Sequence, residues 1–220
     1  MKGVWLEELT WPEAKARFDA DAVVVIPIGA AAKAHGAHLP LKTDALTARA
    51  LAHKLVERLP VVATPVVGFG YYPAFTAFAG SQHLSADTFK ALMRDLIQSL
   101  TAHGVRRIAL VNTGVSTETV LDEIARETGA LVLHMRLTGQ AADPLIEHGE
   151  GGHADERETS VMLALDPRSV RMDRLAPAGE FAQSAATGDP TRASAFKGER
   201  LIEARIDDMV RMLRARWPDL

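Results

Sequence analysis

Cysteine is absent from this chain of 220 residues, and so is any long apolar run. The lack of cysteine excludes disulfides, thiolate metal ligands and a cysteine nucleophile. No apolar run approaches the roughly 20 residues that a membrane-spanning helix needs. The first residues contain no apolar segment typical of a secretory signal. From these absences we expect a cytoplasmic protein with no membrane partner.

Charge of one sign is also scarce, because the formal net charge is only -3. That value gives no support for nucleic acid as a partner. The chain also contains no Gly-x-Ser-x-Gly elbow, no Walker phosphate loop and no dinucleotide glycine fingerprint, which disfavours a Rossmann-type cofactor binder. What is present is ordinary for a soluble globular protein, with 47% hydrophobic and 24% charged residues. We interpret residues 1–220 as one domain.

Apolar segments and helical patterns alternate along the first part of the chain. Four apolar runs without polar alternation are typical of strands buried on both faces, as in parallel sheets: 22–28, 61–69, 105–111 and 130–137. Helical patterns with capping residues occupy 11–19, 44–59, 85–103, 116–128, 154–165 and 195–216. This order predicts an α/β fold, a three-layer α/β/α sandwich with a mostly parallel central sheet.

Ligands of such sheets bind outside the carboxyl ends of the strands, where the loops 29–43, 70–82 and 112–116 are expected. The first of these regions carries His35 and His38 and leads to Asp44. Imidazole and carboxylate groups suit zinc, manganese or iron. The alternative is that these histidines only cap and brace a polar loop. Lys33 lies in the same loop, and we expect it to point to solvent. The alternative is that its charge partly replaces a cation near the site.

A second cluster of polar residues precedes and opens a later helix. His153 ends a glycine-rich loop, and Asp155 and Glu158 lie three residues apart on one predicted helix face. Such a cluster suits one metal ligand and a proton shuttle. The alternative is ordinary capping, because acids are favoured in a first helical turn.

The second loop is rich in aromatic residues. It contains Tyr71, Tyr72, Phe75 and Phe78. These side chains are suited to walling a small apolar pocket. A lid and an oligomer contact remain open alternatives.

Four ordered motifs, over nearly the whole chain, resemble the creatininase (creatinine amidohydrolase) family. They are Pro27-Ile-Gly29 with His35-Gly36-x-His38-Leu39-Pro40-Leu41-x-Thr43-Asp44; Phe78-Ala-Gly80-Ser-x-x-Leu-Ser85; His153-Ala-Asp-Glu-Arg-Glu158-Thr159-Ser160; and Gly188-Asp-Pro-Thr191. The resemblance implies an α/β/α sandwich that is oligomeric, often hexameric. It also implies hydrolysis of an amide-type C–N bond in a small molecule with one or two divalent metals.

The resemblance carries metal-ligand roles to His35 and Asp44 in the first loop and to Glu158 in the third motif. It carries the role of proton shuttle to His153. Two departures stand out. None of the residues 32–34 is the expected glutamate, and the loop 112–116 lacks the expected histidine.

These departures predict a reduced site with one metal held by His35, Asp44 and Glu158. Zinc is the first candidate, and manganese and iron are alternatives. Proton transfer to the leaving nitrogen is assigned to His153 or Glu156. Substrate contacts are expected from His38, Tyr71, Tyr72, Phe78 and Asn112. The rival hypothesis is an inactive protein that keeps the fold and the oligomer and binds a ligand or a partner.

Overall fold

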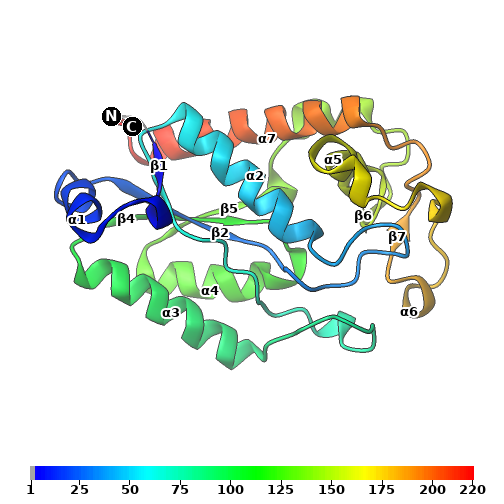
Figure 1. Ribbon diagram of the computed structural model, residues 1–220, viewed down its shortest axis with the longest axis horizontal. Coiled ribbons are helices and arrows are strands. Elements are labelled where there is room, and N and C mark those ends of the chain that lie inside the picture. The colour runs from blue at the N-terminus through cyan, green and yellow to red at the C-terminus, as the bar shows by residue number, and fades with distance from the viewer. Residues whose placement is uncertain (1–2) are drawn as a thin grey trace.

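A five-stranded parallel sheet forms the centre of the computed structural model, which describes residues 3–220 (Figure 1). The strands follow the spatial order β1-β3-β2-β4-β5. Their bounds are Val4–Trp5 (β1), Val62–Ala63 (β3), Val23–Ile28 (β2), Arg107–Asn112 (β4) and Leu131–His134 (β5). All pairs are parallel, so the carboxyl ends of the strands share one edge.

Helices cover both faces of this sheet (Figure 1). One face carries α2 (Thr43–Arg58), α5 (Glu156–Leu165) and α7 (Ala195–Arg216), and the other carries α3 (Ala86–Ala102) and α4 (Glu118–Thr128). A further helix, α1 (Trp11–Asp19), precedes β2. The predicted three-layer α/β/α sandwich is confirmed. Within residues 3–220, none of these helices combines the length and the apolar character required to cross a bilayer.

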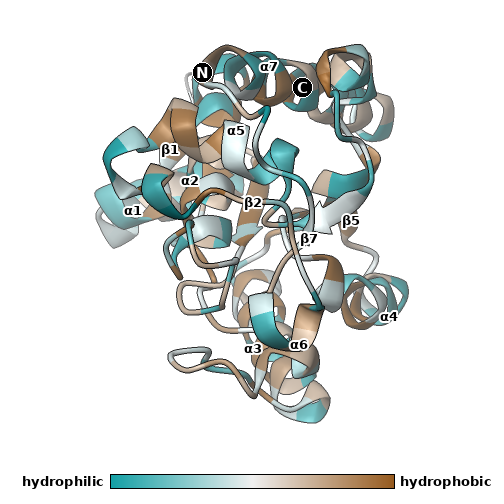
Figure 2. Ribbon diagram, turned by 90° about the vertical axis from the view of Figure 1, so that its right-hand side faces the viewer, coloured by the Kyte–Doolittle hydropathy of each residue, from teal (hydrophilic) through white to brown (hydrophobic). Residues whose placement is uncertain are grey.

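The apolar run in β2 is continuous because its side chains alternate between two cores. Val23 and Val25 pack with α2 and α7, whereas Val24, Ile26 and Ile28 pack with α3 and α4. Accordingly β2 is mostly hydrophobic in Figure 2, while α4 and α7 show hydrophobic and hydrophilic residues in turn. The strand therefore fixes both layers of helices around the loop that follows it.

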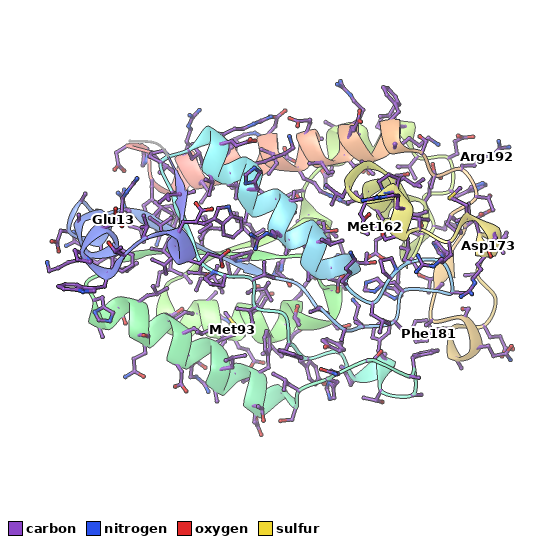
Figure 3. All side chains as sticks on the ribbon, in the orientation of Figure 1. Glu13, Met93, Met162, Asp173, Phe181 and Arg192 are labelled. Atoms are coloured by element: carbon purple, nitrogen blue, oxygen red, sulfur yellow. The ribbon has the colours of Figure 1, made fainter. Side chains whose placement is uncertain are left out.

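Two buried methionines mark different parts of the interior (Figure 3). Met93 on α3 belongs to the core between the sheet and α4. Met162 on α5 belongs to a smaller cluster with Leu39 and Ala154. This smaller cluster joins the loop after β2 to the start of α5, which are distant in sequence.

Some predicted boundaries are wrong. The run 61–69 forms only the two residues of β3, because Pro65 has no N–H to donate to a ladder. The chain nevertheless stays beside β2, since the Val67 N–H donates to the Pro27 carbonyl (2.8 Å). The predicted strand 130–137 ends at His134 and continues as a 3-10 turn. The predicted helix 116–128 begins at Glu118, because Val115–Thr117 form a 3-10 turn.

A small antiparallel pair of strands was not predicted. β6 (Gly151–His153) pairs with β7 (Thr187–Gly188), and the short helix α6 (Phe181–Ser184) precedes β7. Both strands are too short and too rich in glycine to show a period-2 pattern. Their pairing fixes the glycine-rich segment before α5 at the carboxyl edge of the main sheet (Figure 1).

Candidate active site

The loop after β2 is held tightly against the first turn of α2. A side chain at Gly29 is excluded, because its Cβ would lie 2.3 Å from the Asp44 carbonyl oxygen. Gly36 has a φ of +64°, a conformation that glycine adopts without strain. These two glycines let the loop turn inward and carry His35 to a fully buried position.

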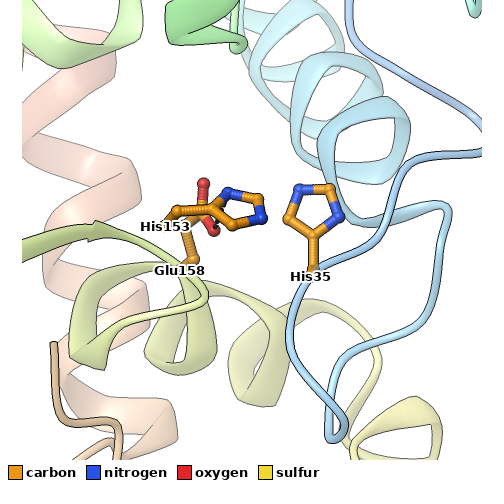
Figure 4. A group of neighbouring side chains, drawn as sticks. All are labelled: His35, His153 and Glu158. Atoms are coloured by element: carbon orange, nitrogen blue, oxygen red, sulfur yellow. Dashed lines mark ion pairs between the residues drawn. The ribbon is translucent and has the colours of Figure 1, made fainter. Parts of the chain in front are cut away.

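His35 meets His153 and Glu158 at the carboxyl edge of the sheet (Figure 4). One ligand atom from each residue lies within 4.8 Å of the others. The two imidazole rings are 4.5 Å apart between centroids. The three residues come from the loop after β2, from β6 and from α5, so only the tertiary structure brings them together.

Backbone carbonyls orient both imidazoles. His35 Nδ1–H donates to the Lys33 carbonyl (2.8 Å), and His153 Nε2–H donates to the Ala34 carbonyl (2.8 Å). The remaining nitrogens face carboxylates, with His35 Nε2 3.0 Å from Asp44 Oδ1 and His153 Nδ1 3.6 Å from Glu158 Oε2. When the His153 ring is neutral, its Nδ1 lone pair points toward Glu158, and a cation between the two would relieve their repulsion. The donor set therefore fits a divalent metal.

Asp44 is also engaged on its other oxygen. Lys33 Nζ lies 2.6 Å from Asp44 Oδ2 and 5.0 Å from the centre of the Phe75 ring. Lys33 is only 4% exposed, so the expectation that it points to solvent is wrong. A buried ammonium requires a charged partner, and Asp44 supplies it. Burial by itself would raise the pKa of Asp44, but the charges of Lys33 and His35 hold it below its ordinary value.

Burial shifts the pKa of both Glu158 and His153. Glu158 Oε2 accepts the Ala154 N–H (2.6 Å), and burial raises the pKa of this carboxyl although His35 opposes the effect. Burial, together with the charges of His35 and Lys33, lowers the pKa of His153 to about 3. His153 is therefore neutral near pH 7. A neutral imidazole retains the lone pair that either metal binding or proton transfer needs.

Two acids near Glu158 have other partners. Asp155 caps α5, because Asp155 Oδ1 accepts the Glu158 N–H (3.0 Å). Both oxygens of Glu156 are occupied by Lys197 Nζ (2.6 Å) and by backbone N–H groups, among them that of His148 (2.6 Å). The structure thus uses Glu156 to anchor the segment before β6.

The residues expected at the substrate side fall into separate places. His38 Nε2 lies 2.8 Å from Thr159 Oγ1 and joins the loop to α5. Asn112 donates to the Gly114 carbonyl (2.8 Å) and accepts from Thr117 Oγ1 (2.8 Å), so its amide shapes its own loop.

The aromatic residues of the second loop divide between two clusters. Tyr72 and Phe75 are buried with Ala34, and Phe78 packs beside them. The Phe75 ring contacts His153, with 4.7 Å between ring centroids. Tyr71 packs instead against the core of α3 and α4. The loop therefore supplies an apolar wall beside His153.

Open space lies on the Glu158 side of the cluster. A cavity of about 230 Å³ is lined by Glu158, Asp155 and Thr113 among others, whereas the cavity beside Lys33 and Asp44 measures only about 10 Å³. The smaller space is about the size of one water molecule. A substrate therefore has room beside Glu158 and none beside Lys33.

Sequence reasoning missed Arg205, which lines the larger cavity and is 5% exposed. Its signal was its position on the buried stripe of α7, four residues after Leu201 and four before Met209. A charged residue on an apolar helix face has either a buried partner or a functional role.

The loop after β4, where the resemblance implies a histidine that this chain lacks, faces Asp44. A Cβ built on Gly114 would lie 3.8 Å from Asp44 Oδ2. This is the carboxylate oxygen that Lys33 contacts. A histidine on this loop would thus compete with Lys33 for the same side of Asp44.

Fold and cluster together define an α/β/α protein with buried histidines and carboxylates at the carboxyl edge of a parallel sheet. The sequence model of the family described as "Creatininase: Creatinine amidohydrolase" matches residues 7–213. The chain belongs to the creatininase family.

Curated relatives in this family carry two kinds of name. A mycofactocin precursor peptide peptidase of Mycobacterium tuberculosis (strain CDC 1551 / Oshkosh) is 30% identical, over 88% of this chain and 85% of the relative. A creatinine amidohydrolase of Pseudomonas putida is 28% identical, over 99% of this chain and 98% of the relative. The family therefore includes both an amidohydrolase and a peptidase.

Solved structures of creatininases are similar over the whole chain. A Zn–Zn form of a creatininase mutant superposes with a TM-score of 0.85 at 27% identity, covering 99% of this chain and all of that one. A manganese form superposes with a TM-score of 0.83 at 26% identity and the same coverage. Zinc and manganese thus occur in structures that share this fold.

Proposed function

We propose that this protein hydrolyses an amide-type C–N bond in a small molecule and uses a single divalent metal, with zinc first and manganese or iron as alternatives. The family membership and the names of two relatives, an amidohydrolase and a peptidase, support the reaction type. One observation supports the metal above all: His35, His153 and Glu158 present ligand atoms within 4.8 Å of one another.

These three residues form the ligand set that we propose. Two imidazoles and one carboxylate are a set that suits catalytic zinc. The set predicted from sequence contained Asp44 in place of His153. Asp44 is paired with Lys33 on one oxygen, so we assign it a neighbouring role beside His35.

A bound divalent metal supplies a water molecule that is nucleophilic near neutral pH. The chain's own groups prepare the site for it. The carbonyls of Lys33 and Ala34 hold the two imidazoles in place. The Lys33 ammonium supplies a fixed positive charge in a region from which Phe75 and Tyr72 exclude water. Asp44 lies 2.6 Å from this ammonium, so Lys33 fixes the Asp44 carboxylate beside His35.

Metal analysis of the purified protein tests the proposal. We expect about one zinc, manganese or iron per chain, and loss of that metal in His35→Ala and Glu158→Gln. Asp44→Asn separates the two ligand sets, because we expect it to keep the metal while His153→Ala loses it. If His153→Ala keeps the metal and loses only hydrolysis, His153 is the proton shuttle instead. Parent protein that takes up no metal on reconstitution would refute the proposal.

The inactive alternative also has a specific observation in its favour. Lys33 occupies the side of Asp44 that the loop after β4 also faces, so a cation is already built into the chain there. In this alternative the ion pair replaces metal altogether. Metal content and hydrolysis of simple amides distinguish the two functions.

A rebuilt site tests whether Lys33 stands in for a second metal. The double variant Lys33→Glu/Gly114→His supplies a carboxylate and an imidazole on the same side of Asp44. Gly114 has a φ of -105°, which a histidine adopts without strain, although its Cβ would lie 3.3 Å from Thr117 Oγ1 and this hydroxyl must shift slightly. We expect the metal content to rise from about one to about two per chain. The matched control, Gly179→His on an exposed glycine with open space around it, should leave the content unchanged.

A further inference from the structure

Arg205 is a buried cation without a partner. It projects from α7, is 5% exposed, and its Nε has no hydrogen-bond acceptor. Within residues 3–220 no hydrogen bond or ion pair reaches its guanidinium. Burial lowers the pKa of Arg205 to about 10, which leaves it charged near pH 7. An unpaired buried charge is strongly unfavourable, so a ligand that supplies the missing acceptors is favoured at this position.

The guanidinium lies on the wall of the 230 Å³ cavity that also contains Glu158. The two other arginines on this wall already have partners: Arg136 pairs with Glu118 (2.6 Å) and Arg157 with Asp143 (3.0 Å). Among the arginines that line this cavity, Arg205 is therefore the one whose N–H groups are free to donate to a ligand.

The nearby acids attract Arg205 without bonding to it. Glu158 and Asp155 raise its pKa through their charge, against the larger effect of burial. Both oxygens of Asp155 accept backbone N–H groups, those of Gly152 and Glu158. Glu158 belongs to the proposed metal site. The donors of Arg205 are thus left for a molecule in the cavity.

The backbone at Gly139 leaves the space that the Arg205 side chain occupies. A Cβ on Gly139 would lie 2.7 Å from Arg205 Cγ, so the side chain passes across a site that only glycine leaves open. The Gly139 N–H donates to Asp208 Oδ2 (2.8 Å), which fixes this loop to α7. The loop therefore holds Arg205 against the cavity.

We propose that Arg205 binds the carboxylate of the substrate, so that the substrate class is an amide that carries a free carboxylate, such as an N-acyl amino acid or a peptide end. A guanidinium presents paired N–H donors that match both oxygens of a carboxylate. This inference rests on the proposed function, since it places the anchored end in the cavity beside Glu158 and the scissile bond at the metal site.

Binding of two small probes tests the proposal. N-acetylglycine and N-acetylglycinamide share an acyl group and differ in the carboxylate. Calorimetric titration of the purified protein should show the acid binding about 10-fold to 100-fold more tightly than the amide, as charged hydrogen bonds require. Arg205→Met should reduce this preference to about 1. Arg157→Met, the matched control in the same cavity, should keep it.

A structural role for Arg205 predicts a different result for stability. Because no bond is lost in Arg205→Met, its melting temperature should equal or exceed that of the parent. A fall of several degrees would show a partner within the protein and overturn the proposal. Equal binding of both probes, binding of neither, or a preference that survives in Arg205→Met would also overturn it.

Chelator treatment separates this proposal from the proposed function. A preference for the acid that persists in metal-free protein and depends on Arg205 supports the carboxylate site even if the protein proves unable to hydrolyse amides. A preference that disappears with the metal means that the metal binds the carboxylate, and the proposal for Arg205 fails.

Discussion

Lys33 and Asp44 form a buried ion pair next to His35, with 2.6 Å between Nζ and Oδ2. The two charges compensate each other, because either charge alone would be strongly unfavourable when it is buried in this position. The pair also leaves Asp44 Oδ1 facing His35. At the scale of single residues, the arrangement of the site thus depends on which positively charged group pairs with each carboxylate.

Removal of the ammonium should be costly. We expect Lys33→Met to lower the free energy of unfolding by about 3–5 kcal/mol, because it leaves the Asp44 carboxylate buried without its partner. The double variant Lys33→Met/Asp44→Asn should be more stable than Lys33→Met, since no charge is then left alone. Urea denaturation measures both. A loss below about 1 kcal/mol in Lys33→Met would contradict the ion pair as described.

His38 should make stability depend on pH. Burial, with a smaller effect of the charge on His35, lowers the pKa of His38 from 6.5 to about 4 in the folded protein. The unfolded chain therefore binds the extra proton between these values, and stability falls as the pH drops from 6.5 to 4. His38→Gln should lose part of this slope, up to about 1 kcal/mol per pH unit.

Thermal unfolding between pH 7 and pH 4 checks the effect of His38. The control is His103→Gln, which changes an exposed histidine and should leave the slope unchanged. Identical slopes in His38→Gln and the parent would show that His38 is not the titrating group.

At the scale of elements, α5 and α7 pack so closely that backbone meets backbone. A Cβ on Gly198 in α7 would lie 1.9 Å from the Ser160 carbonyl oxygen in α5. This close approach places the first turns of α5 and α7 together, where Lys197 reaches Glu156. The contact between Lys197 and Glu156 thus depends on a glycine in α7.

The variant Gly198→Ala distinguishes the effect of helix propensity on stability from the effect of helix packing. Alanine in a helix interior normally stabilises by up to about 1 kcal/mol relative to glycine. Here we expect a loss of about 1–3 kcal/mol, because α5 and α7 must move apart. Glu199→Ala, at the next and exposed position, should change stability by less than about 0.5 kcal/mol. Equal or higher stability of Gly198→Ala in urea denaturation would contradict the close packing.

For the whole molecule, the proposed metal links the loop after β2 to β6 and α5. A ligand that binds only the folded state stabilises it in proportion to its occupancy. We expect chelator treatment to lower the melting temperature, and zinc or manganese to restore it with a stabilisation of about 3 kcal/mol at 100 times the dissociation constant. The same titration on His35→Ala should give no shift. A parent protein indifferent to both treatments would argue for the inactive alternative.

Assembly is the second property of the whole molecule. The resemblance implies an oligomer, often a hexamer, and the surface carries exposed apolar side chains such as Trp11 (79% exposed) and Phe196 (62% exposed). Such residues are frequent at protein contacts when they cluster. We expect light scattering to give a mass above that of one chain, and a monomer at all concentrations would contradict this expectation.

The sequence by itself determined the layers and most of the elements. The continuous run of β2 and the apolar stripes of α3 and α7 are local patterns, and local patterns report which faces of an element are buried. The same is true of His35, Asp44 and Glu158 as candidates, because their loops and caps are readable along the chain. The sequence did not predict β6 and β7, because these strands are too short to show an alternating pattern.

Only the tertiary structure decided which groups each candidate site residue contacts. Lys33 looks like a solvent-exposed loop residue until Asp44 and Phe75 are seen around it. His153 is tethered by a carbonyl from the loop after β2, and Arg205 lies beside Glu158 with its donors free. Partners and burial depend on contacts between distant segments, and no local period records them. The charge balance of the site, on which the proposals for the metal and for the substrate rest, therefore follows from packing.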